Sequence, residues 1–394
     1  MAVDTRDNTF TTNVTGEAAS PLVAGMISFN GLIPRFGTTG SDGNSEVETG
    51  IMTINDLNNW IGRLSTTLYP TGPTGNWAGE WWAVHNYLQY GGVCLVGGTG
   101  STGDYYSSNG VLGITKTPLH NKSLASFDVI FDSGNTFSAG AAIDIATTRK
   151  DCVAIIGNYQ KITGVPGLAA NYSNKLLDFG FDTNSEYVIY VAGRKKFVSG
   201  IIVNSASILE SNVSPDVAGC MARTARDSNI IFSPAGKTKG RILGVVSMQQ
   251  VFGETDSEYL YGGNVNPVVV FPGEGTFLMG NKTSVSGSLS RINTVNTIIS
   301  IKKSVLPVAQ NFLFTINNAS TRSSLVSSII PILDNIRSLG GVTNYRVVCD
   351  TTNNTTTTIA ENKLIVDIYI QVPSVAETLV ITIINTNTSE AFSS

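Results

Sequence analysis

Short, almost continuous apolar runs alternate with helix-like segments through the middle of the chain. Such runs cover residues 127–132, 152–157, 187–191 and 268–271, and residues 138–150 between the first two have helical spacing. Runs that are apolar on both faces are typical of strands in a parallel or mixed sheet covered by helices on both sides. The pattern therefore predicts an α/β core.

The N-terminal part predicts further elements of the same core. Residues 22–29 predict a strand, and residues 54–61 and 81–90 predict helices. Ser214-Pro215 predicts the start of another helix, with Ser214 as N-cap and Pro215 at the first helical position. The polar residues 1–20 have no periodicity and predict an arm outside the core.

The pattern changes after residue 275 to two helices followed by two strands. Helical spacing of apolar residues runs over 292–306 and again over 320–339, with Ser320 or Thr321 as the predicted cap of the second helix. Residues 363–373 predict a strand with one apolar and one mixed face. We therefore predict an α+β domain in this part of the chain.

A last strand is predicted close to the end of the sequence and is apolar on both faces. It either completes a sheet of its own chain or pairs with another copy, and we predict the second arrangement. Its residues are Leu379, Val380, Ile381, Thr382, Ile383 and Ile384. The predicted parts are an arm (1–20), an α/β core (21–275), an α+β domain (276–376) and a C-terminal arm (377–394).

Composition favours a chain with much contact surface. Charged residues make up 14% of the 394 residues, against roughly 25% in typical soluble domains. The composition therefore fits a large β-rich globular protein or a subunit covered by copies of itself. A net charge of −4 argues against non-specific nucleic-acid binding, which needs a basic surface. The sequence holds no apolar run of about 20 residues and no signal-peptide pattern, so we expect no membrane insertion.

Motifs for nucleotide binding are incomplete. Residues 98–103 match GxGxxG after an apolar run, but a polar loop follows where pyrophosphate binding needs a helix. Gly236-Lys237-Thr238 resembles the end of a P-loop, yet Ile231 stands where the first glycine would be. We therefore expect no cofactor.

Residues for catalysis or metal binding are also few. His85 and His120 are the two histidines of the chain, and no GxSxG motif occurs. Asp132-Ser133-Gly134, after an apolar run, is where an α/β hydrolase could carry an acid, so a hydrolase is the alternative of a different class. The cysteines are far apart and match no zinc or redox motif, which predicts buried reduced thiols. They are Cys94, Cys152, Cys220 and Cys349.

Several stretches resemble one known family. Residues 318–324 (NASTRSS), 339–342 (LGGV) and 345–355 (YRVVCDTTNNT) look like the C-terminal domain of contractile phage tail sheath proteins, most closely those of the T-even type. Upstream, residues 264–275 resemble the asparagine-rich loop and FPGxG turn of that family, and residues 217–224 resemble one of its helices. The similarity covers most of the chain, although residues 1–20 lack the SPGVY-type opening of relatives.

The resemblance implies a structural, non-enzymatic subunit of a contractile sheath. Such subunits form stacked hexameric rings around a tail tube, with the baseplate and tail terminator as further partners, and exchange terminal strands. The sheath contracts to drive the tube through the host envelope for genome delivery. The resemblance further implies a core with a subtilisin-like fold but no protease activity, assembly in the host cytoplasm and a place in the virion tail. The alternative within this class is the sheath of a bacterial contractile injection particle. Candidate tube-facing residues are Lys302, Lys303, Arg322 and Arg337.

Overall fold

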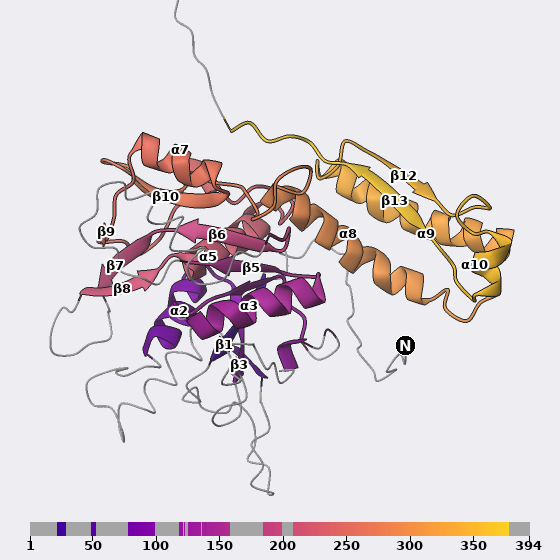
Figure 1. The fold of residues 1–394 in the computed structure, drawn as a ribbon, viewed down its shortest axis with the longest axis horizontal. Helices are drawn as coiled ribbons and strands as arrows, with labels where there is room; N and C mark the ends of the chain where they lie inside the picture. The colour runs from indigo at the N-terminus through magenta and orange to yellow at the C-terminus, as the bar shows by residue number, and fades with distance from the viewer. Residues whose placement is uncertain are drawn as a thin grey trace, which may run out of the picture. The chain divides into compact units, whose positions relative to one another are not determined.

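The computed structural model divides the chain into two compact units, Met1–Asn311 and Phe312–Ser394 (Figure 1). The predicted arm at 1–20, the helix at 54–61 and the strand at 379–384 lie outside the described residues. The structure describes residues 22–28, 49–52, 78–98, 118–120, 122, 125–134, 136–157, 184–198 and 208–377.

Eight described strands of the first unit form one mixed sheet in the order β11-β10-β6-β5-β4-β1-β3-β2. The six inner strands run parallel, and the edge strands β11 and β2 run antiparallel to their neighbours. This sheet confirms the mixed α/β core. Its strands are β1 (Val23–Ser28), β2 (Thr49–Met52), β3 (Val93–Gly98), β4 (Val129–Phe131), β5 (Val153–Ile156), β6 (Val188–Ala192), β10 (Val265–Phe271) and β11 (Gly275–Leu278).

Helices cover the sheet, and Figure 1 shows α3 lying across it. α3 packs on β1, β4 and β5, whereas α5 packs on β4 and β5 and also contacts α2. Every residue of β4, β5 and β6 is buried, so their side chains are covered on both faces. The helices of this unit are α2 (Ala78–Leu88), the short 3-10 helix η1 (Pro118–His120), α3 (Thr136–Arg149), α5 (Ser214–Asp227), α6 (Gly236–Lys239), α7 (Glu254–Gly262) and α8 (Ile292–Gln310).

The first unit also holds a small antiparallel sheet, two strands of which precede α5 along the chain and one of which follows it. β7 (Arg194–Val198) lies between β8 (Ile208–Asn212) and β9 (Ser247–Met248). The N-cap of α5 is Val213, so the prediction that Ser214 caps this helix is wrong. Pro215, predicted at the first helical position, lies in the first turn but follows Ser214, where the helix begins. The Ser214 hydroxyl instead donates to the buried carboxylate of Asp132, which needs donors once it has lost water.

The second unit holds one long helix and a strand pair. α9 (Ala319–Ser338) packs on β12 (Asn344–Val348), which pairs antiparallel with β13 (Asp367–Gln371), and α10 (Thr356–Ala360) lies between the strands in sequence. The cap of α9 is Asn318, whose side chain accepts from the backbone N–H of Thr321 at 2.9 Å. The prediction of Ser320 or Thr321 as the cap is therefore wrong.

The boundary between the units lies after α8, whereas the sequence pattern places a boundary at residues 275–276. Ile292, Val295 and Ile299 of α8 are buried in the same apolar core as the large sheet. The helix therefore belongs to the first unit by packing. Buried side chains of the second unit include Leu325, Ile329, Leu333 and Ile336 of α9, together with Val342 and Cys349.

Candidate assembly surface

The strand pair of the second unit has two open edges among the described residues. β12 and β13 pair over their full length, from Asn344 opposite Gln371 to Val348 opposite Asp367, and no third described strand joins them. An open edge presents unpaired backbone N–H and C=O groups to any extended chain that comes alongside. The pair can therefore accept a further strand.

Two asparagines hold the segment that leads into β13. Asn354, which is buried, donates to the backbone oxygen of Ile365 and accepts from its N–H, both at 2.8 Å. Asn317 donates to the backbone oxygen of Lys363 at 2.9 Å and accepts from Arg322 at 2.8 Å. These bonds fix β13 beside β12, so its edge is preformed. The sequence reasoning missed this role, although the Asn353-Asn354 pair was part of the motif it used.

Two candidate tube-facing residues lie in this unit. Arg322 is buried and donates to Asn317, so its guanidinium is held inside the unit. Arg337 is exposed, pairs with Asp334 at 2.8 Å and lies over the ring of Tyr345, 5.3 Å from the ring centroid. Of these two residues, Arg337 can reach a partner.

The other two candidates lie on α8 in the first unit. Lys303 donates to the carboxylate of Asp128 at 2.6 Å and to the backbone oxygen of Phe127 at 2.8 Å. Lys302 donates to the hydroxyl of Tyr187 at 2.8 Å. Both lysines thus connect α8 to the segments that lead into β4 and β6.

The position expected for a hydrolase acid carries a closed polar network. The buried Asp132 accepts from the Ser214 hydroxyl, from Asn212 at 2.8 Å, and from the N–H groups of Gly157 at 2.9 Å and Gly134 at 3.1 Å. Serine hydrolases need an imidazole between the acid and the serine. Here the serine donates directly to the carboxylate.

The side chains of the two histidines contact residues outside this network. His120 lies 2.8 Å from a carboxylate oxygen of Asp144, and His85 lies 3.4 Å from the side-chain nitrogen of Gln89. Burial, together with the charge of Lys195, lowers the pKa of His85 to about 4. Neither imidazole bonds to Asp132 or Ser214, so these two residues form no triad with a histidine.

The Asp132 network predicts a distinctive dependence of stability on pH. Burial raises the pKa of Asp132 to about 6, above the ordinary 3.8, although bonds from Ser214, Gly157 and Gly134 oppose the shift. The folded chain therefore binds a proton at the Asp132 carboxyl group more tightly than the unfolded chain does. Protonation of Asp132 thus stabilises the folded chain as the pH falls from about 6 towards 4. Relative to an Asp132→Asn variant, the native chain should gain about 2 kcal/mol in free energy of unfolding between pH 7 and about pH 4.5. Urea unfolding at the two pH values measures this gain.

Asp350→Asn is the matched control for that measurement. Bonds from Thr352 lower the pKa of Asp350, an exposed group, so its contribution is present at neutral pH and is lost on acidification. Relative to this variant, the native chain should therefore lose free energy of unfolding as the pH falls. The same direction of change for both variants would contradict the desolvation of Asp132.

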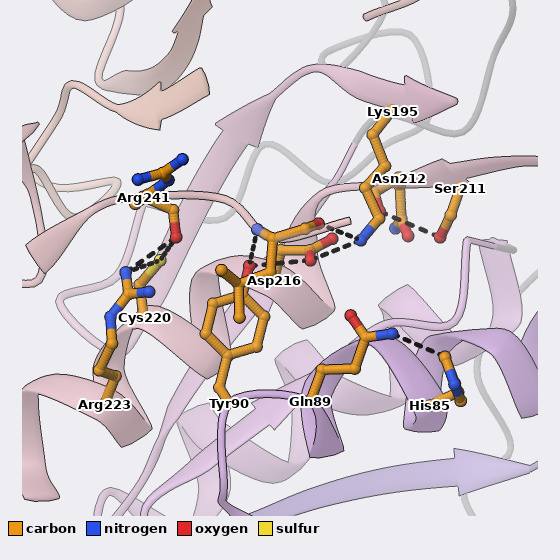
Figure 2. A network of polar contacts seen from close by, with 11 residues as sticks. His85, Gln89, Tyr90, Lys195, Ser211, Asn212, Asp216, Cys220, Arg223 and Arg241 are labelled. Atoms are coloured by element: carbon orange, nitrogen blue, oxygen red, sulfur yellow. Dashed lines mark hydrogen bonds and ion pairs between the residues drawn. The ribbon is translucent and has the colours of Figure 1, made fainter. Parts of the chain in front are cut away.

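A second buried network joins β7 and α5 to the turn that follows α2 (Figure 2). Lys195 and Asp216 are fully buried and 2.7 Å apart, and Figure 2 shows their charged ends facing each other. The Tyr90 hydroxyl donates to the same carboxylate oxygen at 3.0 Å and accepts from the N–H of Leu243 at 2.8 Å. Lys195 also donates to the backbone oxygen of Leu243 at 3.1 Å. This network holds β7 and α5 to the turn after α2 and to the loop that contains Leu243.

The described residues hold no group of His, Cys, Asp or Glu side chains that could bind a metal ion. In the same part of the chain, no helix has the length and apolar character needed to span a membrane. The strand pair with open edges is therefore the strongest candidate site.

A family model matches the last part of the chain, from before α8 onwards. Residues 284–386 match the family model of the phage tail sheath C-terminal domain. The chain is 35% identical over 241 residues to the tail sheath protein of Enterobacteria phage T4, and this covers 58% of the chain and 36% of that protein. The chain is a relative of the phage tail sheath proteins. It is also 36% identical over 179 residues to the tail sheath protein of Vibrio phage KVP40, covering 45% of the chain and 27% of that protein. The chain thus aligns with only about a third of the length of these sheath proteins.

Solved sheath structures share the fold over nearly the whole chain. The sheath of an extracellular contractile injection system (PVC) in the contracted state matches 97% of the chain with a TM-score of 0.67 and 14% identity, over 98% of its own length. The contracted helical sheath of the anti-feeding prophage matches 97% of the chain with a TM-score of 0.65 and 13% identity, over 98% of its own length. At this identity the likeness concerns the fold.

Proposed function

We propose that the chain is a structural subunit of a contractile tail sheath. The open strand pair β12–β13, within residues that match the sheath C-terminal domain, is the observation that carries this proposal. In the proposed assembly, hexameric rings stack around a tail tube and contract to drive it through the host envelope for genome delivery. Its partners are further copies, the tube, the baseplate and the tail terminator. The subunit assembles in the host cytoplasm and becomes part of the virion tail.

The proposed bond between subunits is an exchanged strand. Residues 379–384 of one copy would pair with an open edge of β12–β13 in a neighbour. Strand addition supplies main-chain hydrogen bonds and tolerates many side chains. The alternative is that this segment completes the sheet of its own chain.

The first unit would then serve as a rigid body without catalysis. Its mixed sheet, parallel over the six inner strands, supports a subtilisin-like fold, and the Ser214 hydroxyl bonds directly to Asp132, with no described imidazole between them. A peptidase or esterase activity of the purified protein would revive the hydrolase alternative. The sheath of a bacterial injection particle is a second candidate, favoured by the contracted injection-system sheaths that share the fold.

Electron microscopy of the purified chain, with and without tail tube, tests both the function and the tube contact. The native chain should form striated cylinders, since every copy carries an open edge and an apolar terminal segment. Arg337→Glu should still form cylinders but bind the tube about tenfold more weakly, because a charge facing the tube is reversed. Co-sedimentation with tube measures the second effect.

Arg346→Glu is the control for Arg337. Arg346 is also exposed and also lies over a tyrosine, 4.6 Å from the ring centroid of Tyr369. Equal tube binding by both variants would remove Arg337 from the tube-facing surface. A native chain that never forms cylinders, even with tube, would overturn the sheath function.

A further inference from the structure

Three exposed apolar side chains, Leu313, Phe314 and Ile316, lie at the start of the second unit, and we call this segment the knuckle. The side chains of Leu313 and Ile316 are 50% and 79% exposed, and Phe314 between them is 102% exposed. The backbone of Phe314 has a φ of +62°, a left-handed conformation that a bulky residue rarely adopts. Residues in unfavourable backbone conformations cluster at functional sites, so an exposed aromatic side chain held in one is a candidate contact residue.

Hydrogen bonds on both sides hold the knuckle in shape. The hydroxyl of Thr315 donates to the backbone oxygen of Phe312 at 2.6 Å, and the N–H of Asn318 donates to the backbone oxygen of Ile316 at 3.0 Å. The side chain of Asn317, between Ile316 and Asn318, accepts a hydrogen bond from the buried Arg322, which fixes its position. Phe314 is therefore presented on a preformed turn.

The partner of the knuckle must be apolar and uncharged. No charged residue occurs between Lys303 and Arg322 in the sequence, so the segment offers nothing to a charged surface. Three side chains cover far less than the roughly 800 Å² per partner of a stable pairwise interface. Such a contact contributes only where it is repeated many times, as in a polymer of identical copies.

We propose that Phe314 docks on an apolar surface of a second copy of this chain, an inference that rests on the proposed sheath function. The first unit carries exposed apolar side chains of matching chemistry, Val246 at 55% and Val251 at 59% exposure. A contact between Phe314 of one copy and exposed valines at another place on the next copy is heterologous, and such contacts propagate into rings or helical filaments. The contact is separate from the proposed strand exchange at β12–β13.

Phe314→Asn tests the contact without disturbing the fold. Asparagine tolerates a left-handed backbone, so the urea midpoint of the variant should equal or exceed that of the native chain. The concentration needed to form cylinders without tube should rise at least about tenfold, because an aromatic anchor is lost from every contact. Leu339→Asn, an exposed apolar position of the same unit at 42% exposure, should leave that concentration unchanged. Equal concentrations for native chain and Phe314→Asn overturn the inference and leave the sheath function standing.

Photo-crosslinking identifies the occupant directly. With p-benzoylphenylalanine in place of Phe314, irradiated protein should give a product of two copies of the chain. A product with the tube protein, or a crosslink within one chain, overturns the inference. If the native chain forms no cylinders, the sheath function fails on its own. The inference then survives only if concentrated protein still gives the two-copy product.

Discussion

Deleting residues 377–394 should leave a folded chain that forms no cylinders. Buried apolar residues of the second unit, from Leu325 to Cys349, precede the deletion, and so do both strands of the β12–β13 pair. The deleted part contains the apolar segment 379–384, which we propose to pair with a neighbour. The fold should therefore survive while the bond between subunits is lost.

The expected loss is complete because a single exchanged strand is weak. Burying five apolar side chains contributes about 8–15 kcal/mol. Ordering about ten residues of backbone opposes this by about 10–20 kcal/mol. One C-terminal arm bound to one partner thus contributes little net free energy. In an assembly in which every copy exchanges its arm, later arms bind to partners that are already held in place, and the binding becomes favourable. Removing every arm removes this exchange.

Circular dichroism and electron micrographs of the truncated chain check the two halves of this prediction. A shorter deletion, residues 389–394, is the matched control, since it spares the apolar segment and should leave cylinder formation intact. Cylinders of normal length from the longer deletion would disprove strand exchange.

The sequence pattern predicts the large sheet well because its inner strands are buried on both faces. A continuous apolar run such as residues 153–156 is possible only where helices cover both sides, and β5 lies there. Helix caps were harder to predict. The Ser214 hydroxyl bonds to Asp132, a residue distant along the chain, and the local sequence carries no record of that contact. The Asn318 cap is local, a bond from the N–H of Thr321 three residues on, but Ser320 and Thr321 are capping residue types too, and the pattern did not separate them from Asn318.

The candidate site was predictable only in part. Motifs in the last third of the chain indicated the right family, yet charge alone could not separate a buried arginine from an exposed one. Arg322 bonds inward to Asn317, whereas Arg337 lies on the surface. The open edges of β12 and β13 are a property of topology, which local sequence does not encode. Phe314 went unnoticed for the same reason, since one exposed aromatic among many apolar residues has no sequence signal.

Replacing Asp216 with alanine should destabilise the first unit by about 3–5 kcal/mol. The substitution leaves Lys195 fully buried, with the backbone oxygen of Leu243 as its remaining hydrogen-bond partner in the network. It also removes the acceptor of the Tyr90 hydroxyl. Burial raises the pKa of Asp216, opposed by the charge of Lys195, so the two groups depend on each other for their charged states. Tryptophan fluorescence in urea measures the loss, since all four tryptophans precede residue 311.

A double substitution tests whether the stability lost in Asp216→Ala comes from the unpaired charge of Lys195. Lys195→Met with Asp216→Leu replaces both charges by apolar groups of similar size, and such replacements of buried ion pairs are often neutral or stabilising. The double variant should therefore recover most of the stability that Asp216→Ala loses. A loss below about 1 kcal/mol for Asp216→Ala would mean that water reaches Lys195, and the network would then contribute little to the rigidity of the first unit. A large loss in the single variant together with recovery in the double variant would show that the loss comes from leaving Lys195 buried without its partner, and that a charged pair and an apolar pair stabilise the first unit to a similar degree.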